Sequence, residues 1–144
     1  MIIRAISLYQ PWASLIALGA KKFETRSWYT AYRGPLAIHA GKNPNYLALV
    51  YDTPEFMNAF DGRPPESLPL GAFVCTCTLA DCLQAETVPP DAFGDYAPGR
   101  WAWSLKDVLI LPEPIHARGQ QGFWTCGNLD DGNNLILDPA PPTP

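Results

Sequence analysis

Proline is the feature that most limits how this chain can fold. Sixteen prolines and eleven glycines occur among its 144 residues. Proline breaks a helix interior and glycine weakens helices and strands, so long uninterrupted helices are not expected. Short strands and short helices joined by rigid turns are favoured instead. A coiled coil or a helical bundle is therefore excluded.

Composition indicates one globular domain. Apolar residues make up 47% of the chain and charged residues only 17%, the opposite of the balance in disordered chains. A chain of this length can close one hydrophobic core. We predict a single domain over residues 1–138 and an extended, mobile, proline-rich tail over residues 139–144.

Charge is divided unevenly along the chain. Residues 1–42 contain six lysines and arginines and one acidic residue, whereas the remainder contains four basic and thirteen acidic residues. A net charge of −4 and a pI near 5.0 argue against coating of nucleic acid through bulk charge. A local basic patch in the first third can still attract phosphate. The acidic remainder favours short or structured ligands over long duplexes.

The chain has the features of a cytoplasmic protein. No segment has the roughly 18 consecutive apolar residues that a membrane-spanning helix requires. Gln10-Pro11 interrupts the apolar N-terminal run, so a signal peptide is not expected. We therefore expect the four cysteines to stay reduced. Cys75, Cys77 and Cys82 lack the Cys-x2-Cys spacing of a zinc site, and no metal or other cofactor is expected.

Alternating apolar and polar residues predict a mostly β fold of about six short strands. The strands are expected at residues 2–8, 22–28, 35–40, 70–83, 100–105 and 108–111, with a last short one at 122–126. A helix is predicted over residues 11–19 and two shorter ones across residues 44–60. The fold class is α+β, mostly β: a small, strongly curved sheet or barrel with short helices around it.

The segment after the first helix carries the strongest motif. Residues 19–26 read Gly-Ala-Lys-Lys-Phe-Glu-Thr-Arg, which places Glu24 and Arg26 on one face of a strand. Their spacing of about 6–7 Å along the strand allows an ion pair. With Lys21 as a compact cation and Arg26 as a planar donor, the cluster can bind phosphate, a base edge or a developing oxyanion. A salt bridge with a purely structural role is the alternative interpretation.

This segment resembles the ASCH family, the activating-signal-cointegrator homology domains, whose signature is G-x-K-x-x-E-x-R. The four signature positions are occupied by Gly19, Lys21, Glu24 and Arg26. Three further segments resemble the family in the same order: Gln10-Pro11-Trp12, Arg33 to His39, and Gly99 to Trp103. The resemblance, over roughly residues 5–126, implies a PUA-like β-barrel with a cleft at the signature residues and an RNA-binding role.

We expect RNA or a nucleotide-like small molecule to bind in this cleft. The expected contacts are charged and aromatic side chains: Lys21, Lys22, Glu24, Arg26, Trp28, Arg33, His39 and Arg100. Trp28 shares a strand face with Glu24 and is the candidate for stacking on a base. A core position is the commoner role for a tryptophan.

A hydrolase that uses the same cleft is the alternative function, with Lys21 and Glu24 as its catalytic candidates. Amidohydrolases of the family act on acetylated cytidine with a lysine, a threonine three residues later and a downstream glutamate. Lys21 matches the lysine of this pattern, but the residue three positions later is Glu24 and not a threonine. Thr25 is adjacent, but its side chain is expected on the opposite face of the strand. Asp81 is a candidate for the missing acid.

A metal-independent ribonuclease is the other enzymatic alternative. Glu24 or His39 would act as its base, with Lys21 and Arg26 as electrostatic partners. A hydrogen-bonded histidine at the barrel rim is the commoner role for His39. A third reading is a protein-interaction adaptor, which rests on the proline-rich tail alone.

Overall fold

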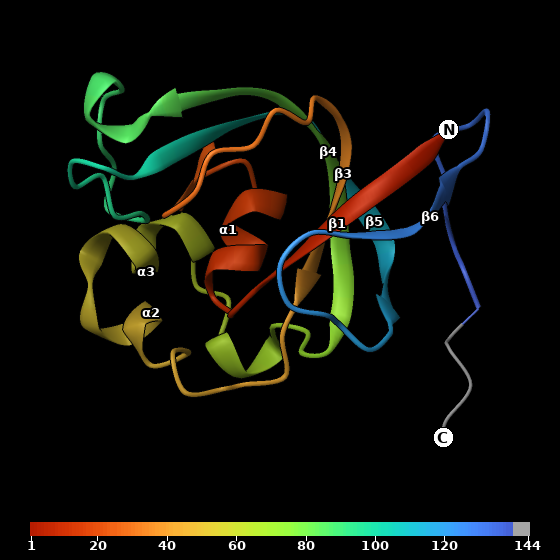
Figure 1. The fold of residues 1–144 in the computed structure, drawn as a ribbon. Helices are drawn as coiled ribbons and strands as arrows, with labels where there is room; N and C mark the ends of the chain where they lie inside the picture. Colours follow the sequence, from red (N-terminus) through yellow and green to blue (C-terminus); the bar gives the residue numbers. More distant parts are fainter. Residues whose placement is uncertain (140–144) are drawn as a thin grey trace.

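A computed structural model describes residues 1–139 of the chain. Within them, seven strands form one sheet in the order β2-β5-β4-β3-β1-β6-β7 (Figure 1). The strands are β1 (Ile2–Leu8), β2 (Phe23–Arg26), β3 (Gly34–Ala40), β4 (Ala72–Gln84), β5 (Trp101–His116), β6 (Trp124–Leu129) and β7 (Leu135–Leu137). The predicted mostly β class is confirmed. The predicted tail, apart from Pro139, lies outside the described residues.

Three short helices of the described chain accompany the sheet: α1 (Trp12–Ala17), α2 (Leu49–Asp52) and α3 (Pro54–Phe60). Figure 1 shows α1 against the sheet, with α2 and α3 farther out on the same side. Gly19 follows α1 with φ of 79°, the left-handed conformation predicted for a helix end. Nowhere in residues 1–139 does a helix combine the length and apolar character needed to cross a bilayer.

The first strand lies inside the sheet. β1 pairs with β3 in parallel and with β6 in antiparallel orientation, so both of its edges are hydrogen-bonded. Alternate residues of β3 pack into two clusters: Leu36 and Ile38 contribute to one core cluster and Ala37 to the other. This arrangement leaves the C-terminal ends of β1 and β3 side by side, where the site described below begins.

The sheet curls strongly, but the predicted barrel is not confirmed. Among residues 1–139, no strand pair joins the two ends of the sheet, β2 and β7. In a flat sheet, the four steps from β2 to β1 would span about 19 Å. Yet Nη2 of Arg26 in β2 donates a hydrogen bond to the carbonyl oxygen of Ser7 in β1 at 3.1 Å. One arginine side chain connects these strands only because the sheet bends toward itself.

The two strands predicted at residues 100–105 and 108–111 are one strand, β5. The intervening Lys106-Asp107 reads as a polar interruption, but it forms a bulge in which the register with β4 shifts between Thr76 and Thr78. Asp107 adopts a left-handed φ of 54°, which aspartate tolerates better than most residues. β7 has no sequence signal, because three residues are too few to show an alternating pattern.

Candidate functional site

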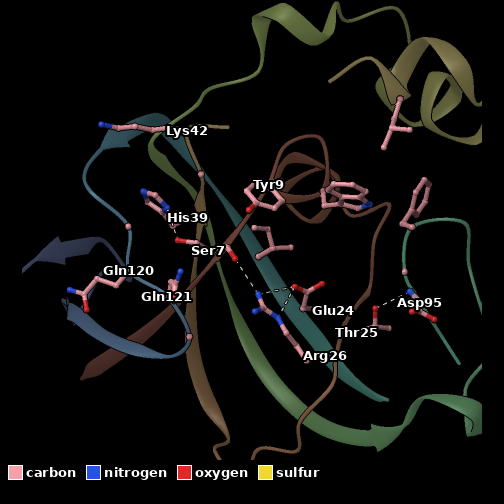
Figure 2. Close-up of a pocket in the computed structure, with 18 of the residues that line it drawn as sticks. Ser7, Tyr9, Glu24, Thr25, Arg26, His39, Lys42, Asp95, Gln120 and Gln121 are labelled. Carbon is pink, nitrogen blue, oxygen red and sulfur yellow. Dashed lines mark hydrogen bonds and ion pairs between the residues drawn. The ribbon is translucent and has the colours of Figure 1, made fainter. Parts of the chain in front are cut away.

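A cavity of about 1150 Å³ opens where β1, β2 and β3 meet the helices. Two loops complete its walls, residues 92–95 and residues 118–122 (Figure 2). It is slightly larger than ordinary ligand pockets, which have volumes of about 300–1,000 Å³. The predicted site residues that line it are Glu24, Arg26, His39 and Arg100.

An ion pair between Glu24 and Arg26 forms the floor of the cavity, as their spacing predicted. Nε of Arg26 donates to Oε2 of Glu24 at 3.0 Å, and Nη2 lies 3.0 Å from the same oxygen. Since Nη2 also donates to the Ser7 carbonyl, Nη1 of Arg26 is the part of the guanidinium without a protein partner in residues 1–139. The floor thus offers a carboxylate acceptor beside an unused guanidinium donor.

Lys21 lies behind Glu24 and does not line the cavity. It is only 2% exposed. Its Nζ donates to the carbonyl oxygen of Phe93 at 3.0 Å and lies 3.5 Å from Oε1 of Glu24. Burial lowers the pKa of Lys21, and the charge of Glu24 opposes that shift. Lys21 is therefore placed to hold Glu24 and the loop at Phe93, and the prediction that it contacts the ligand is wrong.

Ser7 and His39 form a hydrogen-bonded pair in the cavity wall. Oγ of Ser7 lies 2.9 Å from Nδ1 of His39, and Nε2 of His39 lies 2.8 Å from the carbonyl oxygen of Ala117. A carbonyl oxygen can only accept, so Nε2 carries the proton. His39 is 2% exposed, and this burial is the main cause of its lowered pKa. It is thus a buried, neutral, hydrogen-bonded histidine, the commoner of the roles considered.

Acid is expected to destabilise the protein through His39. Its folded-state pKa lies below the ordinary 6.5, so the unfolded chain takes up a proton first as the pH falls through that value. The free energy of unfolding should therefore decrease below about pH 6.5 and level off below the folded-state pKa. Urea unfolding of wild type and His39→Gln at several pH values measures this, and the variant should show a weaker dependence. Identical pH profiles for the two proteins would contradict the assignment.

The loop of residues 118–122 packs directly on this pair. A Cβ atom on Gly119 would lie 2.5 Å from Cε1 and 2.6 Å from Nδ1 of His39, and 2.6 Å from Oγ of Ser7. Only glycine allows the backbone to approach so closely. The next two residues, Gln120 and Gln121, also line the cavity, and their amides have no hydrogen-bond partner in the described part of the chain.

Aromatic side chains form the wall opposite this loop. Tyr9 and Trp12 line the cavity together with Phe56 and Phe93. Tyr9 is 48% exposed, and its ring centroid lies 5.1 Å from that of Tyr46. An exposed ring beside an open cavity is available for stacking on a planar ligand.

Cations line the rim. Lys42 and Arg118 are exposed and form no ion pair with any residue of the described chain. Arg100 is held more tightly, because its Nε lies 3.5 Å from Asp95 and its Nη2 donates to the carbonyl oxygen of Thr25. Lys42 and Arg118 are thus the cations best placed to meet a ligand's negative charge.

Besides Lys21, three predicted binding residues lie away from the cavity. Lys22 lines a smaller, separate depression. Trp28 packs edge-on against Trp103, with ring centroids 4.7 Å apart. Arg33 lies 3.5 Å from Asp81 in an exposed ion pair, so the acid considered for a hydrolase is also outside. Within residues 1–139, no three His, Cys, Asp or Glu side chains group as metal ligands would.

Thr25 lines the cavity, although the alternation of β2 directs it away from Glu24. Its Oγ1 accepts a hydrogen bond from the backbone N–H of Asp95 at 3.0 Å. β2 is an edge strand, so the loop of residues 92–95 can fold around it and extend the cavity. The hydroxyl is therefore engaged in holding this loop.

Comparison with known proteins gives two findings. The sequence profile of the ASCH domain family matches residues 6–94. Activating signal cointegrator 1 of Mus musculus is 40% identical over 81 residues, and the protein of that name from Homo sapiens is 37% identical over 81 residues. These matches cover 54% of this chain but only 14% of each relative. The chain thus corresponds to a small part of either relative.

Proposed function

Because the chain belongs to the ASCH domain family, we propose that it binds single-stranded RNA, or a nucleotide-like small molecule, in the cavity above Glu24 and Arg26. One observation carries this proposal. The same cavity combines an ion pair on its floor, an aromatic wall and two rim cations that form no ion pair within residues 1–139. Each of these features suits one part of a nucleotide.

The floor and the aromatic wall suit a base. A base edge carries donors and acceptors side by side, which complement the carboxylate of Glu24 and Nη1 of Arg26, a donor that no group of residues 1–139 uses. Stacking on an aromatic ring contributes about 1–3 kcal/mol per base in single-stranded complexes. A base that is paired within a duplex cannot enter a cavity, so an unpaired nucleotide is the better fit.

The rim suits the phosphate. Lys42 and Arg118 stand at the cavity mouth without an ion-pair partner in residues 1–139. Such cations bind phosphate and release counterions, which makes affinity depend on salt. Because the rim supplies only these two cations that lack an ion-pair partner among the described residues and the overall charge is −4, a short ligand is favoured over a long polyanion.

The rim cations provide the test. Removing one phosphate contact should reduce the slope of log affinity against log salt by about 0.7 for single-stranded RNA. Lys42→Gln with Arg118→Gln should thus bind a labelled short RNA more weakly and with a shallower slope, measured by fluorescence anisotropy. Lys22→Gln with Lys106→Gln, at the separate depression, is the matched control. An equal loss in both double variants would contradict binding in the cavity.

The same samples separate the alternatives. Binding of a free nucleoside with little salt dependence would identify a small-molecule ligand. RNA fragments, or free acetate from acetylcytidine, would identify a hydrolase. The amidohydrolase alternative is the less favoured one, because Lys21 and Thr25 are both engaged with loop residues 92–95.

We also infer the finer features that the family implies. The curled sheet corresponds in this proposal to a PUA-like barrel open at one edge, formed by a single domain over residues 1–138. A cytoplasmic location agrees with the cysteines, which are buried as free thiols: Cys75, Cys77, Cys82 and Cys126.

A further inference from the structure

Ser7 joins two parts of the cavity wall. Its carbonyl oxygen accepts from Arg26 at 3.1 Å, and its hydroxyl lies 2.9 Å from Nδ1 of His39. Figure 2 shows Ser7 between the Glu24–Arg26 pair and His39, with Lys42 beyond His39. The side chain therefore stands between the proposed base-reading floor and the proposed phosphate-binding rim.

The hydrogen-bond polarity of Ser7 is fixed by the residues behind it. The Ala117 carbonyl holds the single ring proton of neutral His39 on Nε2, so Nδ1 can only accept. The hydroxyl of Ser7 has one proton, and it donates that proton to Nδ1. What remains on Oγ for a ligand is lone pairs. Toward the cavity, Ser7 is an acceptor and not a donor.

We propose that Oγ of Ser7 accepts a hydrogen bond from the ribose 2′-hydroxyl of the bound nucleotide and so distinguishes RNA from DNA. This inference rests on the proposed function. A 2′-hydroxyl is the group that lets a protein tell the two nucleic acids apart. Phosphate oxygens at neutral pH carry no proton to donate, and amino groups of a base are better accepted by the charged carboxylate of Glu24. The sugar, which lies between base and phosphate, supplies the donor at the position of Ser7.

Gly119 limits the size of the group that Ser7 can accept. A single added carbon on Gly119 would already lie 2.6 Å from Oγ of Ser7, so the loop is packed against this atom. A hydroxyl fits beside such a wall more easily than a methoxy group. The site should therefore also reject a 2′-O-methyl nucleotide.

Modified ligands test the proposal on the unmutated protein. A short RNA is compared with versions in which one nucleotide at a time carries 2′-deoxy, 2′-fluoro or 2′-amino. At one position, loss of the donor in the deoxy and fluoro forms should weaken binding about three- to tenfold. The amino form, which can donate, should bind close to the level of RNA. Equal affinity of the fluoro and hydroxyl forms at every position would overturn the proposal.

Ser7→Ala provides the second arm. The RNA-to-DNA affinity ratio should fall close to one in this variant and stay at the wild-type value in Ser104→Ala, which lies at the separate depression. If Ser7→Ala still binds RNA and keeps the wild-type RNA-to-DNA affinity ratio, the proposed role of Ser7 is overturned but the proposed function is not. If wild type binds neither RNA nor free nucleotides, this role and the proposed function are overturned together. If Ser7→Ala does not fold, the series of modified RNAs on the wild-type protein decides whether the site recognises the 2′-hydroxyl.

Discussion

Glutamine in place of Glu24 is expected to lower the free energy of unfolding by about 3–5 kcal/mol. The change preserves shape but removes the charge that faces both Lys21 and Arg26. Because Lys21 is 2% exposed, its ammonium group would be left buried without an ion-pair partner, with only the more distant charge of Asp91 still acting in its favour. Urea unfolding of Glu24→Gln against wild type measures the loss.

The loss should also depend on pH. The pKa of Lys21 already lies below its ordinary 10.5 through burial, and without Glu24 it falls further. The unfolded chain then holds a proton that the folded chain has released, so stability rises with pH up to about 10.5. The deficit of Glu24→Gln should therefore shrink as the solution is made alkaline.

The exposed pair of Arg33 and Asp81 gives a matched control. Its atoms lie 3.5 Å apart, the same distance as Lys21 from Glu24, but the side chains are 35% and 54% exposed. Asp81→Asn should cost about 0–1 kcal/mol, as exposed pairs do. If the two substitutions cost the same, burial of the signature ion pair is not what makes it strong.

Alanine in place of Gly119 is expected to have the second large effect. The added methyl group would lie 2.5–2.6 Å from atoms of His39 and Ser7, so the loop or the histidine must move. Overpacking of this kind costs about 1–3 kcal/mol. Ligand binding should weaken as well, because residues 118–122 form one wall of the cavity. Thermal unfolding and RNA anisotropy report the two effects separately.

Gly41→Ala is the control for this steric argument. Gly41 also lines the cavity, but a Cβ there would meet its nearest atoms at 3.7 Å, an ordinary contact. The variant should keep the stability and RNA affinity of wild type. A Gly119→Ala protein that behaves like Gly41→Ala would show that the loop is not packed against the Ser7–His39 pair in solution.

Local patterns in the sequence predict the core of this fold and the floor of its site. Apolar runs bounded by turn residues predict β1 and β3, and alternation predicts β4. A spacing of two residues on a strand is enough to pair Glu24 with Arg26. These features depend on neighbours within a few residues, so the sequence carries them directly.

The other cavity walls depend on contacts between distant residues. Lys21 is buried because Phe93, seventy-two residues later, supplies its carbonyl acceptor. Gly119 reaches His39 across a similar span, and Lys42 lies at the rim because β1 and β3 end together. No short sequence pattern around Lys21, Gly119 or Lys42 predicts these positions. A pair of closely spaced glycines, Gly119 and Gly122, around two glutamines was the one hint of a functional loop.

The position of β5 bears on how this domain can be cut. Glu24 and Arg26 pair in register with Trp103 and Trp101 of β5, and β2 has no other strand neighbour in residues 1–139. The family match ends at residue 94, before this strand begins. A fragment or chimera whose boundaries followed the match would contain the complete signature but not the strand on which it is mounted. Transplanting this site requires the later strand as well as the motif.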